Sequence, residues 1–253
     1  MITIRNLAVS YHEKQVLFVK DLTFARGEII SVIGQNGAGK STLEKSLSRL
    51  TRYKGDILID RKDLKELTER KRAERIVYLP QSQHSPAMSV KTLVSHGRFP
   101  HLGYSHILKE EDEKIIAEAM EATHVARLQE RFLDELSLGE RQRAYLAMII
   151  ATQSDYLLLD EPTTYLDLGS TMELMEILLN LKKQNKGIMM VVHDLPFAFT
   201  ISDRLILLDH GEVKKIGTPA EMLEDQNVLY ASFHVGIKKI NDASLLYQYV
   251  IVK

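Results

Sequence analysis

Apolar and polar positions divide the chain into strand-like and helix-like stretches. The N-terminal part carries the apolar runs "ITIRNLAVSY", "VLFVKDLTFA" and "EIISVI", with a turn at Gly27 before the last of them. Runs of this composition predict strands. A glycine-rich loop follows, then a helix over residues 40–50, a strand at "GDILID", a charged helix over residues 66–74 and a strand at "IVYLP".

The pattern changes between residues 81 and 153. Loops rich in glycine and proline alternate there with two amphipathic stretches, "EEDEKIIAEAMEAT" and "GERQRAYLAMIIAT", and no strand pattern is present. Strand and helix patterns then alternate again, through "YLLLD", a helix over residues 170–184, "GIMMVVH", one or two helical turns and a hairpin, "RLILLDHGEVKKIG", with Gly211 in its turn. In the tail from residue 228, apolar and polar residues alternate, and this pattern predicts two strands.

This order predicts an α/β fold with a mainly parallel sheet, because apolar strands alternate with helices on both sides of the helical stretch. We expect one domain over residues 1–253. Residues 1–80 and 154–253 would form the α/β core, which includes an antiparallel N-terminal β subdomain. Residues 81–153 would form an inserted helical subdomain.

Composition narrows the functional classes. Of the 253 residues 45% are apolar, which suffices for a large core, and the net charge of −1 lacks the basic excess of a nucleic-acid binder. The absence of cysteine excludes disulfides, thiolate catalysis and Cys-ligated metal sites. The start lacks a signal-peptide pattern, and no apolar run reaches the roughly 18 residues that span a bilayer. We therefore expect an intracellular protein that would reach a membrane only through a partner.

The stretch "GQNGAGKST" carries the most specific chemistry. It follows the apolar strand "EIISVI", opens a helix and fits G-x-x-x-x-G-K-[ST], the phosphate-binding loop. Backbone N–H groups and the helix N-terminus would hold phosphates, Lys40 would reach the β- and γ-phosphates, and Ser41 would ligate Mg²⁺. A flexible turn with a stray lysine is the alternative. The predicted nucleotide-binding residues are Gly34, Gln35, Asn36, Gly37, Ala38, Gly39, Lys40, Ser41 and Thr42.

Three other apolar strands also end in polar residues. "YLLLD" ends in Asp160 and is followed by Glu161, "IVYLP" leads to Gln81, and "GIMMVV" leads to His193. Ligands of open α/β sheets bind beyond the carboxyl ends of the strands. Asp160 and Gln81 are therefore candidates for holding Mg²⁺, Glu161 for polarising the attacking water and His193 for sensing the γ-phosphate. Each residue taken singly could equally be a solvated strand end.

The stretch "LSLGERQR" has two interpretations. Ser137 and Glu140 form a capping box for the following helix, which by itself explains both residue types. A helix N-terminus with a serine hydroxyl and an unobstructed Gly139 is also a second phosphate-binding surface. Because the chain already has one phosphate loop, this second surface would cover a nucleotide held by another copy of the chain.

Together these motifs resemble the ATP-binding subunits of ATP-binding cassette (ABC) transporters. The resemblance implies a head-to-tail dimer that sandwiches two MgATP, and it gives Tyr11 the role of stacking on adenine. It assigns Walker A to residues 34–42, the Q-loop to Gln81, the signature to residues 136–140, Walker B to residues 156–160, the catalytic carboxylate to Glu161, the D-loop aspartate to Asp167 and the switch histidine to His193. The signature departs from the family's Leu-Ser-Gly-Gly-Gln at Leu138 and Glu140.

The histidine-rich stretch "SHGRFPHLGYSH" is a weaker indication. Because His96, His101 and His106 are five residues apart, neither a helix nor a strand would bring all three to one metal ion. "GRFPH" and "EPTTYLD" resemble instead the subgroup that serves ferric siderophore, haem and cobalamin importers. The resemblance implies contact with a permease, and Phe99, Leu102, Tyr104 and Ile107 would form an apolar surface for it. The alternative is a loop folded over its own subdomain. The predicted interface residues are Arg98, Phe99, Pro100, His101 and Tyr104.

We therefore expect an ATPase subunit, with ATP and Mg²⁺ as cofactors, that energises import of a metal chelate at the cytoplasmic face of a membrane. Its expected partners are a second copy, a transmembrane permease and, indirectly, an extracytoplasmic solute-binding protein, with no nucleic acid. Three alternatives are an ABC ATPase for another solute or for export, a soluble non-transport cassette, and a nucleotide-binding regulator without catalysis. Glu161 and His193 speak against the last.

Overall fold

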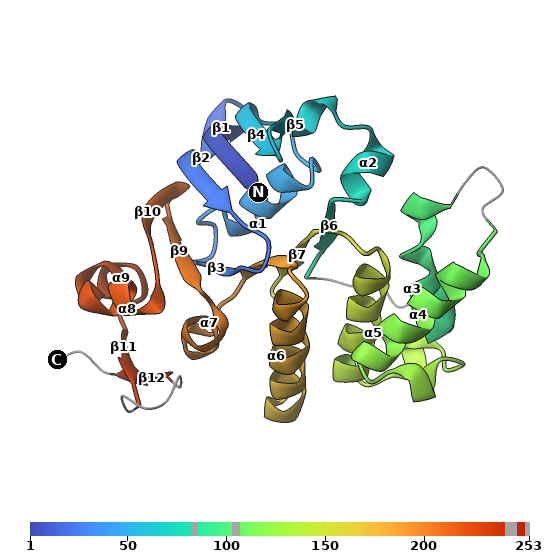
Figure 1. Ribbon diagram of the computed structural model, residues 1–253. Coiled ribbons are helices and arrows are strands. Elements are labelled where there is room, and N and C mark those ends of the chain that lie inside the picture. The colour runs from blue at the N-terminus through green and yellow to red at the C-terminus, as the bar shows by residue number, and fades with distance from the viewer. Residues whose placement is uncertain (82–85, 103–106, 241–246, 251–253) are drawn as a thin grey trace.

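The computed structural model describes residues 1–81, 86–102, 107–240 and 247–250 (Figure 1). The strands are β1 (Ile2–Tyr11), β2 (Lys14–Phe24), β3 (Ile29–Ile33), β4 (Lys54–Ile59), β5 (Lys62–Asp63), β6 (Ile76–Leu79), β7 (Tyr156–Asp160), β8 (Gly187–Val191), β9 (Arg204–Asp209), β10 (Glu212–Gly217), β11 (Gly236–Lys239) and β12 (Tyr247–Val250). The helices are α1 (Lys40–Leu47), α2 (Glu69–Ala73), α3 (Val90–His96), α4 (Glu110–Ala122), α5 (Leu138–Ala151), α6 (Leu168–Lys183), α7 (Leu195–Ile201), α8 (Pro219–Glu224) and α9 (Gln226–Phe233). Four 3₁₀ turns complete them, η1 (Leu64–Glu66), η2 (Phe99–His101), η3 (Ala126–Leu128) and η4 (Leu133–Glu135).

One sheet of ten strands organises the molecule, in the order β5-β4-β1-β2-β10-β9-β3-β8-β7-β6. The five strands from β9 to β6 are parallel to one another. Strands β1, β2, β4 and β5 pair antiparallel, and they join the rest through a single residue pair between Glu212 in β10 and Phe18 in β2. The predicted α/β fold with a mainly parallel sheet and an antiparallel N-terminal part is confirmed.

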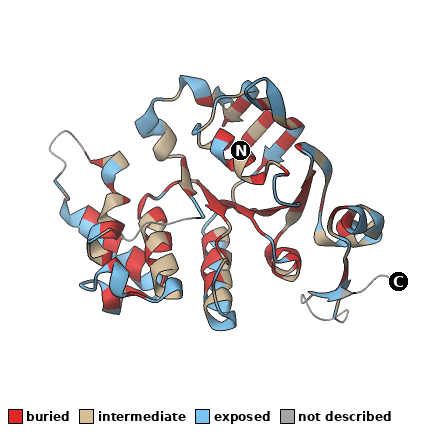
Figure 2. Cartoon of the chain, turned by 180° about the vertical axis from the view of Figure 1, so that it is seen from behind, coloured by how far each residue is buried: buried red, intermediate tan, exposed pale blue. Residues whose placement is uncertain are grey.

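The central strands are buried on both faces. Every residue of β3, β7 and β8 is buried (Figure 2), as the continuous apolar runs predict. Alternate residues of β7 serve two cores: Leu157 and Leu159 face the side covered by α5, α6 and α7, and Leu158 faces the side with α1 and the antiparallel strands. The sheet is therefore fixed from both sides at the point where the site is built.

The segment between β6 and β7 is helical. Its described residues contain no strand, and helices α3, α4 and α5 pack around a separate apolar cluster that includes Val94, Ile116 and Ala147. The predicted helical subdomain is confirmed as a helical region inserted between two neighbouring strands (Figure 1). No helix among the described residues is long and apolar enough to cross a bilayer.

Several predicted element boundaries were wrong. Helix α1 ends at Leu47 rather than at residue 50, because Arg49 takes a left-handed conformation with φ 59°. Helix α2 begins only after Thr68, whose hydroxyl accepts the backbone N–H of Lys71 and caps the helix. The tail begins with helix α9, which buries Leu229, before the two predicted strands β11 and β12. Its alternating residues fit a helical period as well as a strand period.

Two short helices were missed. Helix α3 is capped by the hydroxyl of Ser89, which accepts the N–H of Thr92. Helix α8 has a capping box between Thr218 and Glu221, with Pro219 at its first position. Both cap signatures are readable in the sequence, so a search for caps would have found these helices.

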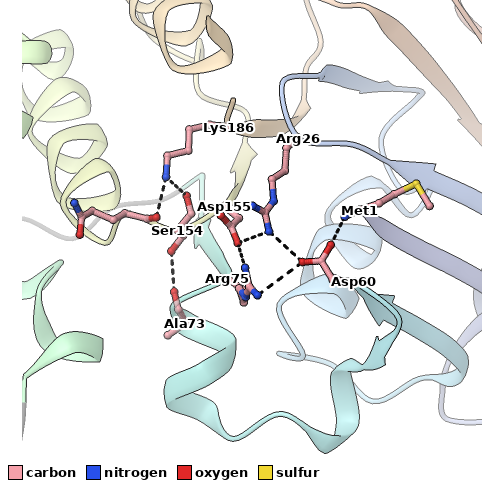
Figure 3. A network of polar contacts seen from close by, with 9 residues as sticks. Met1, Arg26, Asp60, Ala73, Arg75, Ser154, Asp155 and Lys186 are labelled. Carbon is pink, nitrogen blue, oxygen red and sulfur yellow. Dashed lines mark hydrogen bonds and ion pairs between the residues drawn. The ribbon is translucent and has the colours of Figure 1, made fainter. Parts of the chain in front are cut away.

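A network of charges lies at the amino ends of the parallel strands (Figure 3). Asp155, directly before β7, pairs with Arg26 at 3.0 Å and with Arg75, which directly precedes β6. Arg26 also pairs at 3.0 Å with Asp60, which binds the N-terminal ammonium group. That ammonium group lowers the pKa of Asp60. These ion pairs tie the edge of the sheet opposite to the one that carries the motif residues.

Candidate functional site

Four neighbouring strands deliver the predicted residues to one edge of the sheet. Strands β3, β8, β7 and β6 are adjacent in that order, and their carboxyl ends lead to the phosphate loop, His193, Asp160 with Glu161, and Gln81. Since the strands are parallel, all four ends lie at the same edge. The sequence singled out these strand ends separately, and the fold brings them together.

The phosphate loop is fixed by glycine conformations and by its own lysine. Gly34 has φ 155°, and a Cβ atom there would lie 2.1 Å from the carbonyl oxygen of Leu208. Gly39 caps α1 in a left-handed conformation with φ 99°. The Lys40 ammonium group donates to the carbonyl oxygens of Gly34 at 2.8 Å and Gln35 at 2.9 Å. Burial lowers the pKa of Lys40, an effect that the nearby carboxylates oppose.

A pocket of about 300 Å³ opens over this loop. It is lined by Tyr11, Val16, Asn36, Gly37, Gly39, Lys40, Ser41, Thr42 and Glu161. Tyr11 is partly exposed at its rim, with its hydroxyl oxygen 3.1 Å from that of Thr51. Three predicted nucleotide-binding residues are not among the lining residues: Gly34 and the buried Ala38 support the loop from behind, and the Gln35 side chain donates to the backbone oxygen of Ser232 in α9.

Asp160 is held by two hydroxyl groups at the inner wall of the site. Ser41 donates to one of its carboxylate oxygens and Tyr78 to the other, each at 3.0 Å. Burial and the Asp160 carboxylate raise the pKa of Tyr78. The hydroxyl and carboxylate oxygens of Ser41 and Asp160 are the hard donors that Mg²⁺ prefers, so this pair fits the cation. Tyr78 was missed, because its position in an apolar strand gives no indication of its partner.

Glu161 receives three hydrogen bonds. His193 Nε2 donates to one carboxylate oxygen at 2.7 Å, and the other accepts from the Thr164 hydroxyl at 3.0 Å and from the Gln81 amide. Glu161 itself has a left-handed backbone with φ 52°, a conformation uncommon outside glycine and asparagine. In the described structure Gln81 therefore contacts the predicted catalytic carboxylate rather than the predicted Mg²⁺ ligand Asp160.

Polar groups of the signature segment form hydrogen bonds with one another. The Ser137 hydroxyl caps α5 by accepting the N–H of Glu140, and the Glu140 carboxylate accepts from the Ser137 N–H at 3.0 Å and hydroxyl at 2.9 Å. These bonds lower the pKa of Glu140. At Gly139 an added Cβ atom would lie 2.5 Å from the Ser170 hydroxyl of α6, so only glycine fits between the two helices at this position. Asp167 likewise caps α6 by accepting the Ser170 N–H at 2.7 Å.

Exposed apolar side chains surround this junction of α5 and α6. Tyr165 is 82% exposed. Leu138, Leu168 and Met172 are also exposed. Leu138 is the first residue of α5, and Leu168 and Met172 lie in the first two turns of α6. Large apolar side chains that are exposed close together are typical of surfaces that bind other molecules.

The segment "GRFPH" is partly a surface and partly an internal anchor. Arg98 was predicted to contact a permease, but it is only 5% exposed, because its guanidinium group pairs with Asp112 at 2.9 Å and donates to the carbonyl oxygen of Ala151 at 2.8 Å. His101 donates to the carbonyl oxygen of Thr152 at 2.8 Å. Phe99 is 53% exposed.

The rest of the predicted apolar surface is mixed. Leu102 is buried, Ile107 is exposed and Pro100 is half-buried. Tyr104 and His106 lie outside the described residues. His96 stacks on Phe99, with ring centroids 4.7 Å apart. Within the described ranges no three His, Asp or Glu side chains are grouped to hold a metal ion.

A phosphate loop on a parallel sheet, a hydroxyl–carboxylate pair and a glutamate held by three hydrogen bonds define a nucleotide-binding protein of the P-loop class. Comparison with known families matches residues 19–164 to the ABC transporter family. This match covers more than half of the chain, and the chain belongs to the ABC transporter family as an ATP-binding subunit.

The similar proteins are transport ATPases. The chain is 37% identical to the iron(3+)-hydroxamate import ATP-binding protein FhuC of Bacillus subtilis, over 93% of this chain and 88% of FhuC. It is 40% identical to the petrobactin import ATP-binding protein YclP of the same organism, over 88% of this chain and 89% of YclP. A solved ABC transporter described as metal-chelate type, in an inward-facing conformation, matches with a TM-score of 0.84 at 27% identity, covering 100% of this chain and 97% of that one.

Proposed function

We propose that the chain is the ATP-hydrolysing subunit of an importer for ferric siderophores or a similar metal chelate. The observation that carries ATP hydrolysis is Glu161, whose carboxylate lines the phosphate-loop pocket and is oriented by His193, Thr164 and Gln81. The cargo class is supported by relatives at 37–40% identity, whose names are those of iron-hydroxamate and petrobactin import proteins.

Each group has a distinct role in this proposal. The loop amides and Lys40 bind the phosphates of ATP. Ser41 and Asp160 would hold Mg²⁺, which supplies charge neutralisation on the phosphate oxygens. Glu161 accepts a proton from the attacking water, and His193, already bonded to that carboxylate, keeps it aimed at the pocket.

A second copy of the chain completes the site. Ser137 and Gly139 of the signature, with Glu140 beside them, would face the nucleotide of the other copy, and Asp167 would lie between them. The exposed apolar set formed by Leu138, Tyr165, Leu168 and Met172 supports this surface, because burial in a dimer removes it from water.

The permease would contact the helical region over residues 81–153. Phe99, Pro100 and Ile107 offer apolar surface there, and His101 lies beside them, whereas Arg98 holds the segment from within. In this arrangement the subunit lies at the cytoplasmic face of the membrane. An extracytoplasmic solute-binding protein delivers the chelate to the permease.

Glu161→Gln tests the catalytic assignment. The variant should bind ATP and accumulate as a dimer. It should hydrolyse ATP at less than about one hundredth of the parent rate, because a general base contributes roughly 10²–10⁴-fold to the rate. Glu176→Gln, an exposed glutamate in the middle of α6, is the matched control and should hydrolyse normally. Parent-like turnover in Glu161→Gln would remove Glu161 from the role of base.

Phe99→Asp tests the permease surface. It should leave basal ATP hydrolysis intact and abolish co-purification with the membrane permease. Leu50→Asp, at an even more exposed leucine after α1, should retain both. Identification of the solute bound by the receptor of the co-purified native complex tests the cargo class. A receptor that binds no metal chelate would overturn that part of the proposal.

A further inference from the structure

The C-terminal segment, formed by α9, β11 and β12, has no role in the proposed reaction, yet it is anchored in the main core. Leu229 of α9 and Ile237 of β11 are fully buried, in the apolar cluster that also contains Phe199 of α7. Strand β12 packs on α7, where the rings of Tyr247 and Phe199 lie 5.4 Å apart (Figure 1). This packing fixes the position of the polar contacts that the segment makes.

Helix α9 is bonded to the phosphate loop. The side-chain amide of Gln35 donates to the backbone carbonyl oxygen of Ser232, a residue that is only 5% exposed. Gln35 itself is exposed, so this bond holds a side chain that solvent would otherwise surround. The backbone carbonyl oxygen of Gln35 accepts from the Lys40 ammonium group at 2.9 Å. One residue therefore connects the phosphate-binding lysine with the C-terminal segment.

Strand β12 is bonded to the start of α7. The Tyr249 hydroxyl accepts the backbone N–H of Leu195, the first residue of α7, at 3.1 Å. N–H groups in the first turn of a helix have no partner within the helix, so this contact supplies one. Directly before Leu195 lie Asp194, whose carboxylate caps α7, and His193, which donates to Glu161 at 2.7 Å. Tyr249 thus holds the chain just beyond the histidine that orients the proposed catalytic carboxylate.

A short path within the segment joins these two contacts. Ser232 lies in the last turn of α9, and the turn that follows is closed by a hydrogen bond from the His234 N–H to the Tyr230 carbonyl oxygen at 2.8 Å. Strand β11 comes next, and its Ile237 pairs with Tyr249 of β12. Because Ile237 is fully buried and the turn is closed, we expect α9 and the two strands to move as one body.

We infer that the C-terminal segment couples the phosphate loop to the switch histidine, with Gln35 and Tyr249 as its positioning residues. The inference rests on the proposed roles of the phosphate loop in binding ATP and of His193 in orienting Glu161. Phosphate oxygens compete with the Gln35 carbonyl oxygen for Lys40, so ATP acts on the same residue that the segment holds. Neither Gln35 nor Tyr249 lines the pocket, so both act through the elements that they hold.

A double-mutant cycle of Gln35→Leu and Tyr249→Phe tests the coupling. Two quantities are measured on the full chain: the Kd of a fluorescent, non-hydrolysable ATP analogue, and kcat of ATP hydrolysis at saturating MgATP. Each single variant should raise Kd and lower kcat by about fivefold, the size expected for loss of one hydrogen bond. The double variant should lose no more than either single variant, because breaking the connection at one end is sufficient.

Gln248→Leu and Tyr247→Phe are the matched controls. Gln248 is an exposed glutamine beside Tyr249 in β12, and Tyr247→Phe keeps the ring that packs against Phe199. Both controls should keep the parent values of Kd and kcat. Urea unfolding without nucleotide shows whether each variant is folded under the assay conditions. Gln35→Ala replaces the leucine variant if the latter does not fold.

The inference fails if the two contacts act locally. In that case Gln35→Leu would change only Kd and Tyr249→Phe only kcat, or their effects would multiply in the double variant. It also fails if neither variant changes either quantity, because the segment is then only packed. Lys40→Ala in the same binding assay tests the underlying site. Parent-like affinity in Lys40→Ala would refute the phosphate loop itself, whereas lost affinity together with local effects of the other two variants would refute only the coupling.

Discussion

Replacement of Arg98 by alanine should destabilise the helical region. The guanidinium group pairs with Asp112 at 2.9 Å and donates to the Ala151 carbonyl oxygen at 2.8 Å and to Gln153 at 3.1 Å. Removing one member of a buried pair costs about 3–5 kcal/mol, because the other charge is left without its partner. Asp112 keeps its bond to the backbone N–H of Lys109, so its charge would still be partly compensated. We therefore expect the lower end, about 3 kcal/mol.

Urea unfolding of the nucleotide-free subunit measures this loss. With a denaturant slope near 3 kcal/mol per molar, at the upper end for small proteins, the midpoint should fall by about 1 M. Arg98→Lys keeps the charge but not the planar fork, and should recover only part of the stability. In an Arg98→Ala/Asp112→Asn double-mutant cycle the two losses should not add, because both remove the same pair.

One result would refute this reasoning. Exposed ion pairs contribute up to about 1 kcal/mol to stability. If Arg98→Ala lowers the free energy of unfolding by less than this, and yet weakens permease association as much as Phe99→Asp, then Arg98 is a surface contact. Because Arg98 is only 5% exposed, we expect Arg98→Ala to lower the stability of the helical region rather than to act on permease association directly.

Three further outcomes follow from single contacts. Burial raises the folded-state pKa of Glu44 above 4.5, so the parent protein loses stability as the pH rises above that value. The urea midpoint of Glu44→Gln should therefore exceed that of the parent by an amount that grows between about pH 4.5 and 8. Below pH 4.5 the two midpoints should coincide. Tyr249→Phe removes the acceptor of the Leu195 N–H at 3.1 Å and should lower the free energy of unfolding in urea by about 1 kcal/mol, whereas Tyr247→Phe should leave it unchanged. Glu140→Gln removes an anion from the surface that would face phosphate, and should tighten ATP-dependent dimerisation in ultracentrifugation; unchanged dimerisation would count against the signature assignment.

The edge of the sheet that carries the candidate site was predictable because each of its parts is encoded by a short local stretch of sequence. A continuous apolar run such as "YLLLD" specifies a strand buried on both faces, and the polar residue after it must emerge at the carboxyl end. Four such runs, one of them ending in a phosphate loop, place Lys40, Asp160 and His193 together without knowledge of any contact. Strand order was not needed, since all parallel strands end at the same edge.

Contacts between distant segments were not predictable in this way. Arg98 stands beside the exposed Phe99, and nothing nearby in the chain shows that its side chain turns inward to Asp112 and Ala151, which belong to other helices. The hydrogen bond from Tyr78 to Asp160 was unpredictable for the same reason. The periodicity of a sequence predicts which face of a helix or strand is buried. Which residue that face contacts depends on how several elements pack together.

The two proposed phosphate-binding surfaces differ in the bonds that their polar groups already make. Lys40 is bonded to two neutral carbonyl groups, and phosphate oxygens would replace them with stronger charge-assisted bonds, so ATP binding by one chain is favourable without rearrangement of the loop. Ser137 instead donates to the Glu140 carboxylate within a completed capping box. To contact the phosphate of a second chain, the Ser137 hydroxyl would have to give up its bond to the Glu140 carboxylate. The same contact would bring this negatively charged carboxylate close to the negatively charged phosphate. If the signature segment faces the nucleotide of a second chain, as proposed, closure of the dimer rather than binding of ATP is the step that Glu140 would weaken.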